Sequence, residues 1–146
     1  MTYQIRSAEE RRQAILDNAA RLGIDDAFIS KLVDTFYARV RAHPRLGPIF
    51  NGEIDDWDAH LAKLKDFWAS VAMNAGRYSG KPVPAHFKLQ GITREDFQTW
   101  LGLFQATLED LADSEETVAY FMQRAERIAQ SLQLAMFGLE SLERKG

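Results

Sequence analysis

The sequence contains no cysteine, and this absence excludes several kinds of chemistry at once. Disulfides, thiolate zinc sites, iron–sulfur clusters and cysteine nucleophiles all need a thiol. The longest apolar run is the five residues from Val118 to Met122, whereas a membrane-spanning helix needs about 20. The N-terminus has no hydrophobic signal region either, so we expect a cytoplasmic protein with no membrane partner.

An excess of charge of one sign is also missing. Lysine and arginine number 18 and aspartate and glutamate 21, which gives a net charge of −3 and argues against nucleic acid as a partner. The motifs GxGxxG, GxxxxGK and GxSxG are absent, so nothing indicates a nucleotide-binding or acyl-transfer enzyme. The length of 146 residues and the hydrophobic fraction of 46% predict a single globular domain over residues 1–146.

Proline is scarce, and its four copies fall in two short windows, 44–48 and 82–84. Because no segment shows sustained period-two alternation, the sequence predicts an all-α protein without a sheet. Apolar residues recur at helical spacing in the stretches between and beside the prolines. The predicted elements are main helices over 8–21, 26–42, 55–74, 93–111 and 114–142, a short helix over 84–91, and a loop over 46–52 (LGPIFNG).

Local signals mark the ends of these helices. Ser7 with Glu10, and Thr93 with Asp96, have the spacing of a capping box. Asp25 or Asp26 can cap the second helix, and Ser114 or Thr117 the last, since short polar side chains accept hydrogen bonds from the first free backbone amides. The segment 1–24 is therefore expected to be a helical N-terminal extension.

Three histidines are present, His43, His60 and His86. A lone histidine beside apolar residues is usually a core or rim residue with one satisfied hydrogen bond. His43 lies at a predicted helix end, where a cation is favourable to the helix dipole, and for it we keep a structural interpretation. Zinc is not expected, because a zinc site needs three or four ligands and the sequence has neither cysteine nor an HxxxH pair.

Aromatic residues gather on the predicted inner faces. Such a stripe is more often plain core than a cofactor site, but here two histidines, a tyrosine and tryptophans face the same interior. An apolar pocket with a few polar groups suits a flat apolar cofactor with one reactive metal. The residues are Phe36, Tyr37, Phe50, Trp57, Phe67, Trp68, Phe97, Trp100 and Phe104.

Four stretches between Phe36 and Leu108 resemble the group III truncated haemoglobins, in order and with compatible spacing. They are FYARVRAHPRLGPIFN, WDAHLAKLKDFW, GRYSGKPVPAHFKL and FQTWLGLFQATL. The spacings of 26 residues from His60 to His86 and 14 from His86 to Trp100 also agree with that family. The resemblance implies a globin-like two-over-two helical sandwich around haem b, here with an extra N-terminal helix.

The resemblance also implies roles for individual residues. His86 matches the proximal ligand of the haem iron, and Phe50 matches a phenylalanine that packs on the haem face. Leu64 matches an apolar wall position and Trp68 a core tryptophan. The distal residues, which would surround a ligand on the other side of the iron, are Tyr37, His60 and Trp100.

The propionates of a haem would need partners at the rim of the pocket. Lys63 follows His60 by three residues, and its apolar stem can cover haem while its ammonium group reaches solvent. Arg77 and Tyr78 lie in the loop that leads to His86. An exposed ion pair stabilises by only about 0–1 kcal/mol, so single changes here should barely alter haem affinity.

The sequence leaves the activity open. One hypothesis is a monomer that binds dioxygen, nitric oxide, carbon monoxide or small anions. Another is an enzyme for nitric oxide dioxygenation or peroxidase-like chemistry, which would need an external electron-donor reductase because no such domain is fused here. A sensor would need an output domain. A cofactor-free helical interaction protein, with Tyr37, His60 and Trp100 as plain core, is the alternative from a different class.

Overall fold

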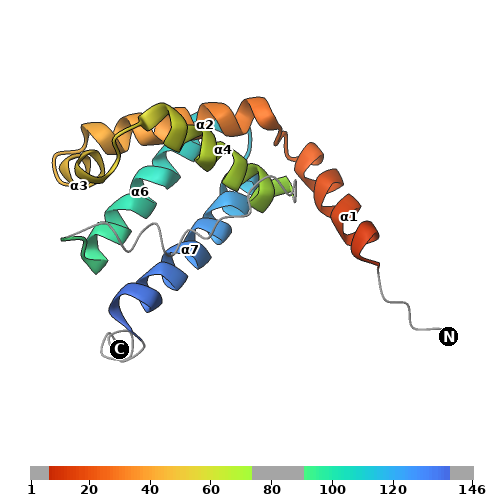
Figure 1. The fold of residues 1–146 in the computed structure, drawn as a ribbon. Coiled ribbons are helices and arrows are strands. Elements are labelled where there is room, and N and C mark those ends of the chain that lie inside the picture. Colours follow the sequence, from red (N-terminus) through yellow and green to blue (C-terminus); the bar gives the residue numbers. More distant parts are fainter. Residues whose placement is uncertain (1–6, 74–90, 139–146) are drawn as a thin grey trace.

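The computed structural model describes residues 7–73 and 91–138, and within these ranges every regular element is an α-helix (Figure 1). The all-α class predicted from the sequence is thus confirmed. The described helices are α1 (Ala8–Arg21), α2 (Asp26–Ala42), α3 (Leu46–Glu53), α4 (Trp57–Met73), α6 (Arg94–Leu111) and α7 (Glu115–Phe137). None of them is long and apolar enough to cross a membrane.

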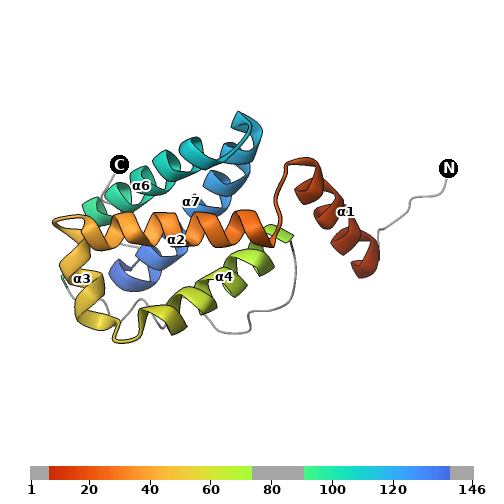
Figure 2. The ribbon, with the colours of Figure 1, turned by 90° about the horizontal axis from the view of Figure 1, so that it is seen from above.

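The helices form two layers. In Figure 1, α2 and α4 lie above α6 and α7, and Figure 2 shows α7 passing beneath α2. Helix α2 is central to this arrangement, because it contacts α3, α4 and α6, while α6 and α7 pack along each other. The two-over-two sandwich implied by the resemblance is confirmed.

Helix ends that depend on local signals lie where the sequence predicts them. In the first capping box, the Ser7 hydroxyl accepts from the Glu10 amide at 3.1 Å, and the Glu10 carboxylate accepts from the Ser7 amide at 3.2 Å. Thr93 and Asp96 form the second box at the start of α6. These contacts satisfy amides that have no partner inside the helix, and so they fix its first residue.

The predicted loop over 46–52 is wrong, because these residues belong to α3. Pro48 is the third residue of the helix, where no intrahelical amide bond is lost. Gly47 does not break the helix but allows a close approach: a Cβ there would lie 2.4 Å from the backbone oxygen of Arg41. A tertiary contact with α2 thus explains a glycine that looks like a helix breaker.

Two predicted ends are also corrected. Helix α7 ends at Phe137 rather than Leu142, because Gly138 takes a φ of 82°, which favours glycine and stops the helix. Helix α4 begins at Trp57 rather than Asp55. Residues 84–90 of the short helix predicted over 84–91 lie outside the described residues, and Gly91, expected to end it, has a φ of 78°.

The core is largely aromatic. The Trp68 ring stacks on that of Phe104 at 5.0 Å, and Phe104 in turn stacks on Trp100 at 5.9 Å with an interplanar angle of 4°. Phe36 packs edge-on against both Trp100 and Phe104. Helices α2, α4 and α6 therefore share one continuous aromatic cluster, which places the side chains of the candidate site.

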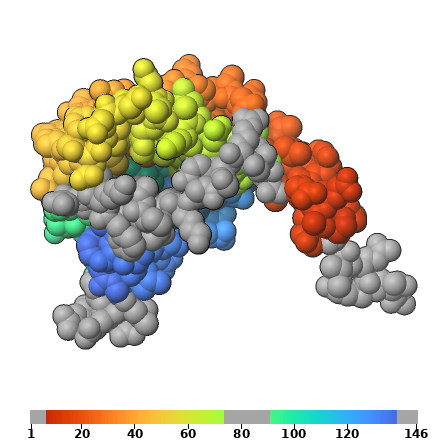
Figure 3. All heavy atoms as spheres, viewed as in Figure 1, coloured from red at the N-terminus to blue at the C-terminus, as the bar shows by residue number. Residues whose placement is uncertain are grey.

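Helix α1 projects from one end of the molecule (Figures 1 and 3) and contacts α4. Only Ala19 is buried within it. Its end is attached to α7 by an Arg21–Glu116 ion pair at 2.7 Å and by the Thr117 hydroxyl, which donates to the Leu22 carbonyl at 2.9 Å. The helical N-terminal extension predicted from the sequence is present.

Candidate functional site

The three distal residues come from three helices that meet in the core. Tyr37 on α2 and Trp100 on α6 are 3% and 8% exposed, and His60 on α4 is half-buried. The Tyr37 and His60 rings lie 6.3 Å apart and are perpendicular to each other. Since they come from separate elements, these side chains can surround a small ligand rather than line one side of it.

Burial determines the protonation state of the tyrosine. Loss of solvent around the phenol raises the pKa of Tyr37 far above its ordinary value, and a hydrogen bond with the Trp100 side chain acts in the opposite direction. The phenol therefore stays neutral at physiological pH and keeps its O–H as a donor. Trp100 adds an indole N–H, which can only donate.

Trp100 also borders an apolar cavity. The cavity lies between α3, α6 and α7, and its wall includes the side chain of Phe50, whose ring is 6.3 Å from that of Tyr37. Asp96 is the polar exception in this wall. The other lining residues are Leu46, Ile92, Phe97 and Leu132.

The remaining candidates on α4 differ in exposure. Leu64 is half-buried and packs against the core, whereas Lys63 is exposed. Trp68 is 2% exposed, in agreement with its expected place in the core. His86, Arg77 and Tyr78 lie outside the described residues.

His43 has a structural role of a different kind from the one expected. Its ring nitrogen Nδ1 accepts hydrogen bonds from the backbone amides of Arg45 and Leu46, both at 3.1 Å. It therefore caps the start of α3 as an acceptor, instead of serving as a cation at the end of α2.

An ion pair between the exposed Arg45 and the buried Asp96, beside the cavity, was not predicted from the sequence. The Arg45 guanidinium donates to both carboxylate oxygens of Asp96, at 3.1 and 2.9 Å, and to the Gly91 carbonyl at 2.6 Å. Arg45 holds the pKa of the Asp96 carboxyl below its ordinary value, with further help from Thr93. No local pattern links these residues, since Arg45 and Asp96 are 51 positions apart.

The contacts of Trp57 were also missed. The sequence places it on the inner face of its helix, but gives no sign that Arg41 lies over its ring or that Asn51 accepts from its indole. Both partners come from other elements, α2 and α3. Only the three-dimensional structure brings them together beside Tyr37 and His60.

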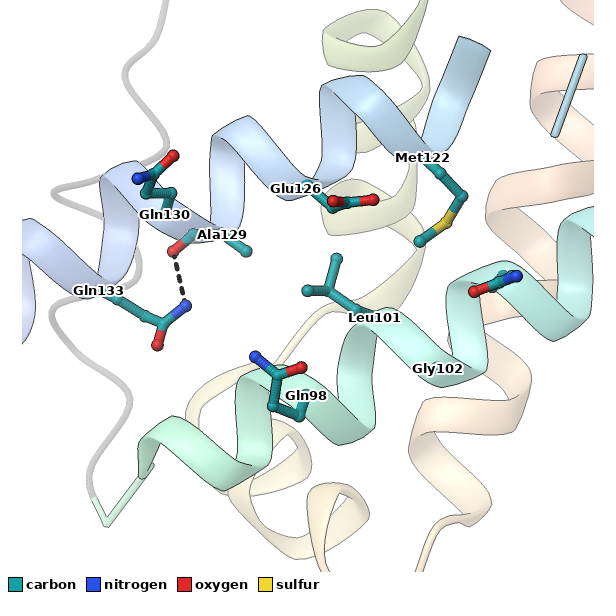
Figure 4. Close-up of a pocket in the computed structure, with 9 residues that line it drawn as sticks. Gln98, Leu101, Gly102, Met122, Glu126, Ala129, Gln130 and Gln133 are labelled. Atoms are coloured by element: carbon teal, nitrogen blue, oxygen red, sulfur yellow. Dashed lines mark hydrogen bonds between the residues drawn. The ribbon is translucent and has the colours of Figure 1, made fainter. Parts of the chain in front are cut away.

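A groove on the described part of the chain lies away from the candidate residues. It has a volume of about 620 Å³, runs between α6 and α7, and contains several glutamines and none of the candidate residues (Figure 4). In it, the Gln133 amide donates to the Ala129 carbonyl at 3.3 Å. None of its lining residues is a histidine, the residue that ligates haem iron in globins.

Comparisons with known proteins agree with this geometry. The family model for bacterial-like globins matches residues 20–134. Group 3 truncated haemoglobin ctb of Campylobacter jejuni is 36% identical over 118 residues, which cover 78% of this chain and 92% of that protein. Group 2 truncated haemoglobin YjbI of Bacillus subtilis is 28% identical over 120 residues, which cover 79% and 88%.

A solved structure gives the same result. The crystal structure of group III truncated haemoglobin from Campylobacter jejuni matches with a TM-score of 0.72 and 38% identity, over 77% of this chain and 91% of that one. The fold and the matched residues define the class as the globins, which bind haem. Within that class, the chain belongs to the bacterial-like globin family and is similar to its group III truncated haemoglobins.

Proposed function

We propose that this globin binds haem b through His86 and holds a diatomic gas or small anion among Tyr37, His60 and Trp100. The observation that carries the proposal is the position of Trp100. Its side chain borders the apolar cavity, and its ring shares the neighbour Phe36 with the buried ring of Tyr37. When bound, haem supplies an iron atom that coordinates such ligands.

The cavity wall suits a flat, mostly apolar cofactor. Phe50, Phe97 and Leu132 offer apolar contacts from three helices, and large cofactors are generally enclosed by such walls with few polar groups. Leu64 adds an apolar position on α4. Lys63, exposed on the same helix, is a candidate partner for a propionate, together with Arg77 and Tyr78.

The distal residues supply hydrogen-bond donors. Tyr37 and Trp100 are buried, and in such surroundings a hydroxyl or indole donor would stabilise a ligand that gains negative charge. One hydrogen bond to a charged group contributes about 1.5–3 kcal/mol, which corresponds to roughly tenfold to hundredfold in affinity. His60, which is half-buried on α4, would be a third donor.

The same donors favour a second candidate, nitric oxide dioxygenation or peroxidase-like turnover. This activity requires electrons, so we propose a separate reductase as partner of a cytoplasmic, monomeric globin. Dioxygen dissociation and nitric oxide consumption measured on one preparation separate the two. Slow dissociation without turnover supports ligand binding, whereas rapid consumption with a donor supports the enzyme.

His86→Ala tests the haem ligand. The variant should lose haem to an acceptor protein much faster than the wild type, because no CxxCH motif attaches the cofactor covalently. His60→Ala is the matched control, since it removes the other pocket histidine and should keep haem. Equal retention in His86→Ala and the wild type, with the same Soret spectrum, would contradict the assignment.

A further inference from the structure

Trp57 is the first residue of α4, and two other helices hold its half-buried indole ring. The guanidinium carbon of Arg41 on α2 lies 4.5 Å from the ring centroid, within the range of a cation–π interaction. The indole N–H donates to the Asn51 side-chain oxygen on α3 at 3.0 Å. The orientation of this ring is therefore fixed by two contacts, one on its face with Arg41 and one at its edge with Asn51.

The fixed ring touches two of the distal residues. Its centroid lies 5.7 Å from that of His60 and 6.1 Å from that of Tyr37. The His60 ring is perpendicular to both neighbours, at 88° in each case, and the three rings form one cluster in which each ring contacts the other two. Helical side chains lean toward the N-terminus, which brings His60 over the residue three positions earlier, Trp57.

We propose that Trp57 is a positioning residue that holds the His60 imidazole toward Tyr37 and thereby limits ligand entry into the distal site. The imidazole cannot turn toward the start of α4 without displacing an indole that Arg41 and Asn51 anchor. This inference rests on the proposed function of the pocket. It assigns to Trp57, Arg41 and Asn51 a role in entry kinetics rather than in contact with the bound ligand.

A purely structural role of Trp57 predicts a different dependence of the ligand kinetics on His60. If Trp57 only connects α3 to α4, its removal lowers stability and changes ligand kinetics, if at all, whether or not His60 is present. If Trp57 acts through His60, its effect on kinetics disappears when the imidazole is gone. A double-mutant cycle between the two residues separates these cases.

The experiment measures carbon monoxide association to the ferrous, haem-loaded, full-length protein after flash photolysis. Trp57→Ala should accelerate association by about tenfold, and Asn51→Ala should act in the same direction to a smaller extent. In a His60→Leu background, both changes should alter the rate by less than about twofold. Trp57→Phe, which keeps an aromatic ring beside the imidazole, should restore most of the wild-type rate.

Tyr120→Ala is the matched control. Tyr120 is also a half-buried aromatic under an arginine, with Arg124 at 3.5 Å from its ring, and its hydroxyl donates to the Ala72 carbonyl far from the distal residues. This variant should leave the association rate unchanged. The Tyr120→Ala variant shows how much the loss of a comparable structural contact, away from His60, changes the carbon monoxide association rate.

The outcomes distinguish the inference from the function on which it rests. Equal acceleration by Trp57→Ala in both backgrounds, or an unchanged rate in the wild-type background, overturns the positioning role while the pocket remains. If Trp57→Ala does not fold, Asn51→Ala and Trp57→Phe decide by the same comparison. A wild-type chain that takes up no haem, or whose haem binds no carbon monoxide, refutes the proposed function and the inference with it.

Discussion

Asp96 shows how one residue can serve both the fold and the wall of the cavity. Its carboxylate accepts from Arg45 and from the Thr93 amide, so one side chain closes the capping box of α6 and attaches α3 to α6. It is 4% exposed and borders the cavity beside Trp100. A charge in this position is tolerated because each oxygen has a donor.

Replacement of Asp96 by asparagine should therefore lower stability. Loss of hydrogen bonds to a charged group costs about 1.5–3 kcal/mol, which denaturant unfolding at neutral pH can measure. Asp110→Asn is the control, because Asp110 pairs with Arg39 at the surface and such pairs contribute about 0–1 kcal/mol. Equal losses in the free energy of unfolding in both variants would contradict the stronger stabilisation assigned to Asp96.

The stability difference between the wild type and Asp96→Asn should depend on pH, with a sign that follows from the pKa of Asp96. Because Arg45 lowers the pKa of folded Asp96, the carboxylate stabilises the fold above the unfolded pKa of about 3.9. That contribution is lost as the pH falls through the lower folded value. The difference in stability between wild type and Asp96→Asn should accordingly be constant near neutrality and shrink in acid.

At the scale of elements, the structure separates what local sequence determines from what it does not. Caps such as Ser7 with Glu10 act within four residues, so the sequence predicts the starts of α1 and α6 closely. Helix α3 was missed because its proline and glycines look like a loop, while a contact with α2 and the His43 cap stabilise it.

The candidate site likewise contains residues that the sequence indicates and contacts that it does not. The sequence singles out Tyr37, His60 and Trp100 because they belong to motifs in register, and these residues do lie close together from three helices, although their distal role stays a prediction. The Arg41–Trp57–Asn51 and Arg45–Asp96 contacts could not, since each joins side chains from separate elements without a local spacing rule. The expected role of His86 stays a prediction.

Helix α3 gives a prediction with a built-in control. Gly47→Ala should destabilise the protein by about 1–3 kcal/mol, because the added Cβ would lie 2.4 Å from the Arg41 backbone oxygen. Gly52→Ala changes the same helix, but its Cβ would have no neighbour within 4 Å. It should be neutral or stabilise by roughly 0.5–1 kcal/mol, since alanine favours helix over glycine. Thermal and denaturant unfolding of both variants check this, and similar losses would refute it.

At the scale of the whole molecule, α1 is an addition to the globin body. The family match begins at residue 20, after nearly all of α1, and the helix has one buried residue. None of its residues borders the cavity that contains Trp100. The pocket therefore does not depend on the outer turns of α1.

Removal of residues 1–17 should leave the pocket intact. The truncation keeps Ala19, Leu22 and Ile24, which are buried in the core, and also the Arg21–Glu116 ion pair. We expect haem retention and carbon monoxide association to match those of the full chain, with stability slightly reduced. A truncated protein that loses haem rapidly would show instead that the outer part of α1 supports the globin body.

The most direct test of the account is the rate of dioxygen dissociation from the haem-loaded protein in which the donors of Tyr37 or Trp100 are removed. Tyr37→Phe and Trp100→Phe each remove one donor and keep an aromatic ring in the core. If these groups hold the ligand, stopped-flow dissociation should accelerate by about tenfold or more in each variant. If both variants lose stability while dissociation keeps the wild-type rate, the buried tyrosine and tryptophan only fill the core, and the polar distal pocket is contradicted.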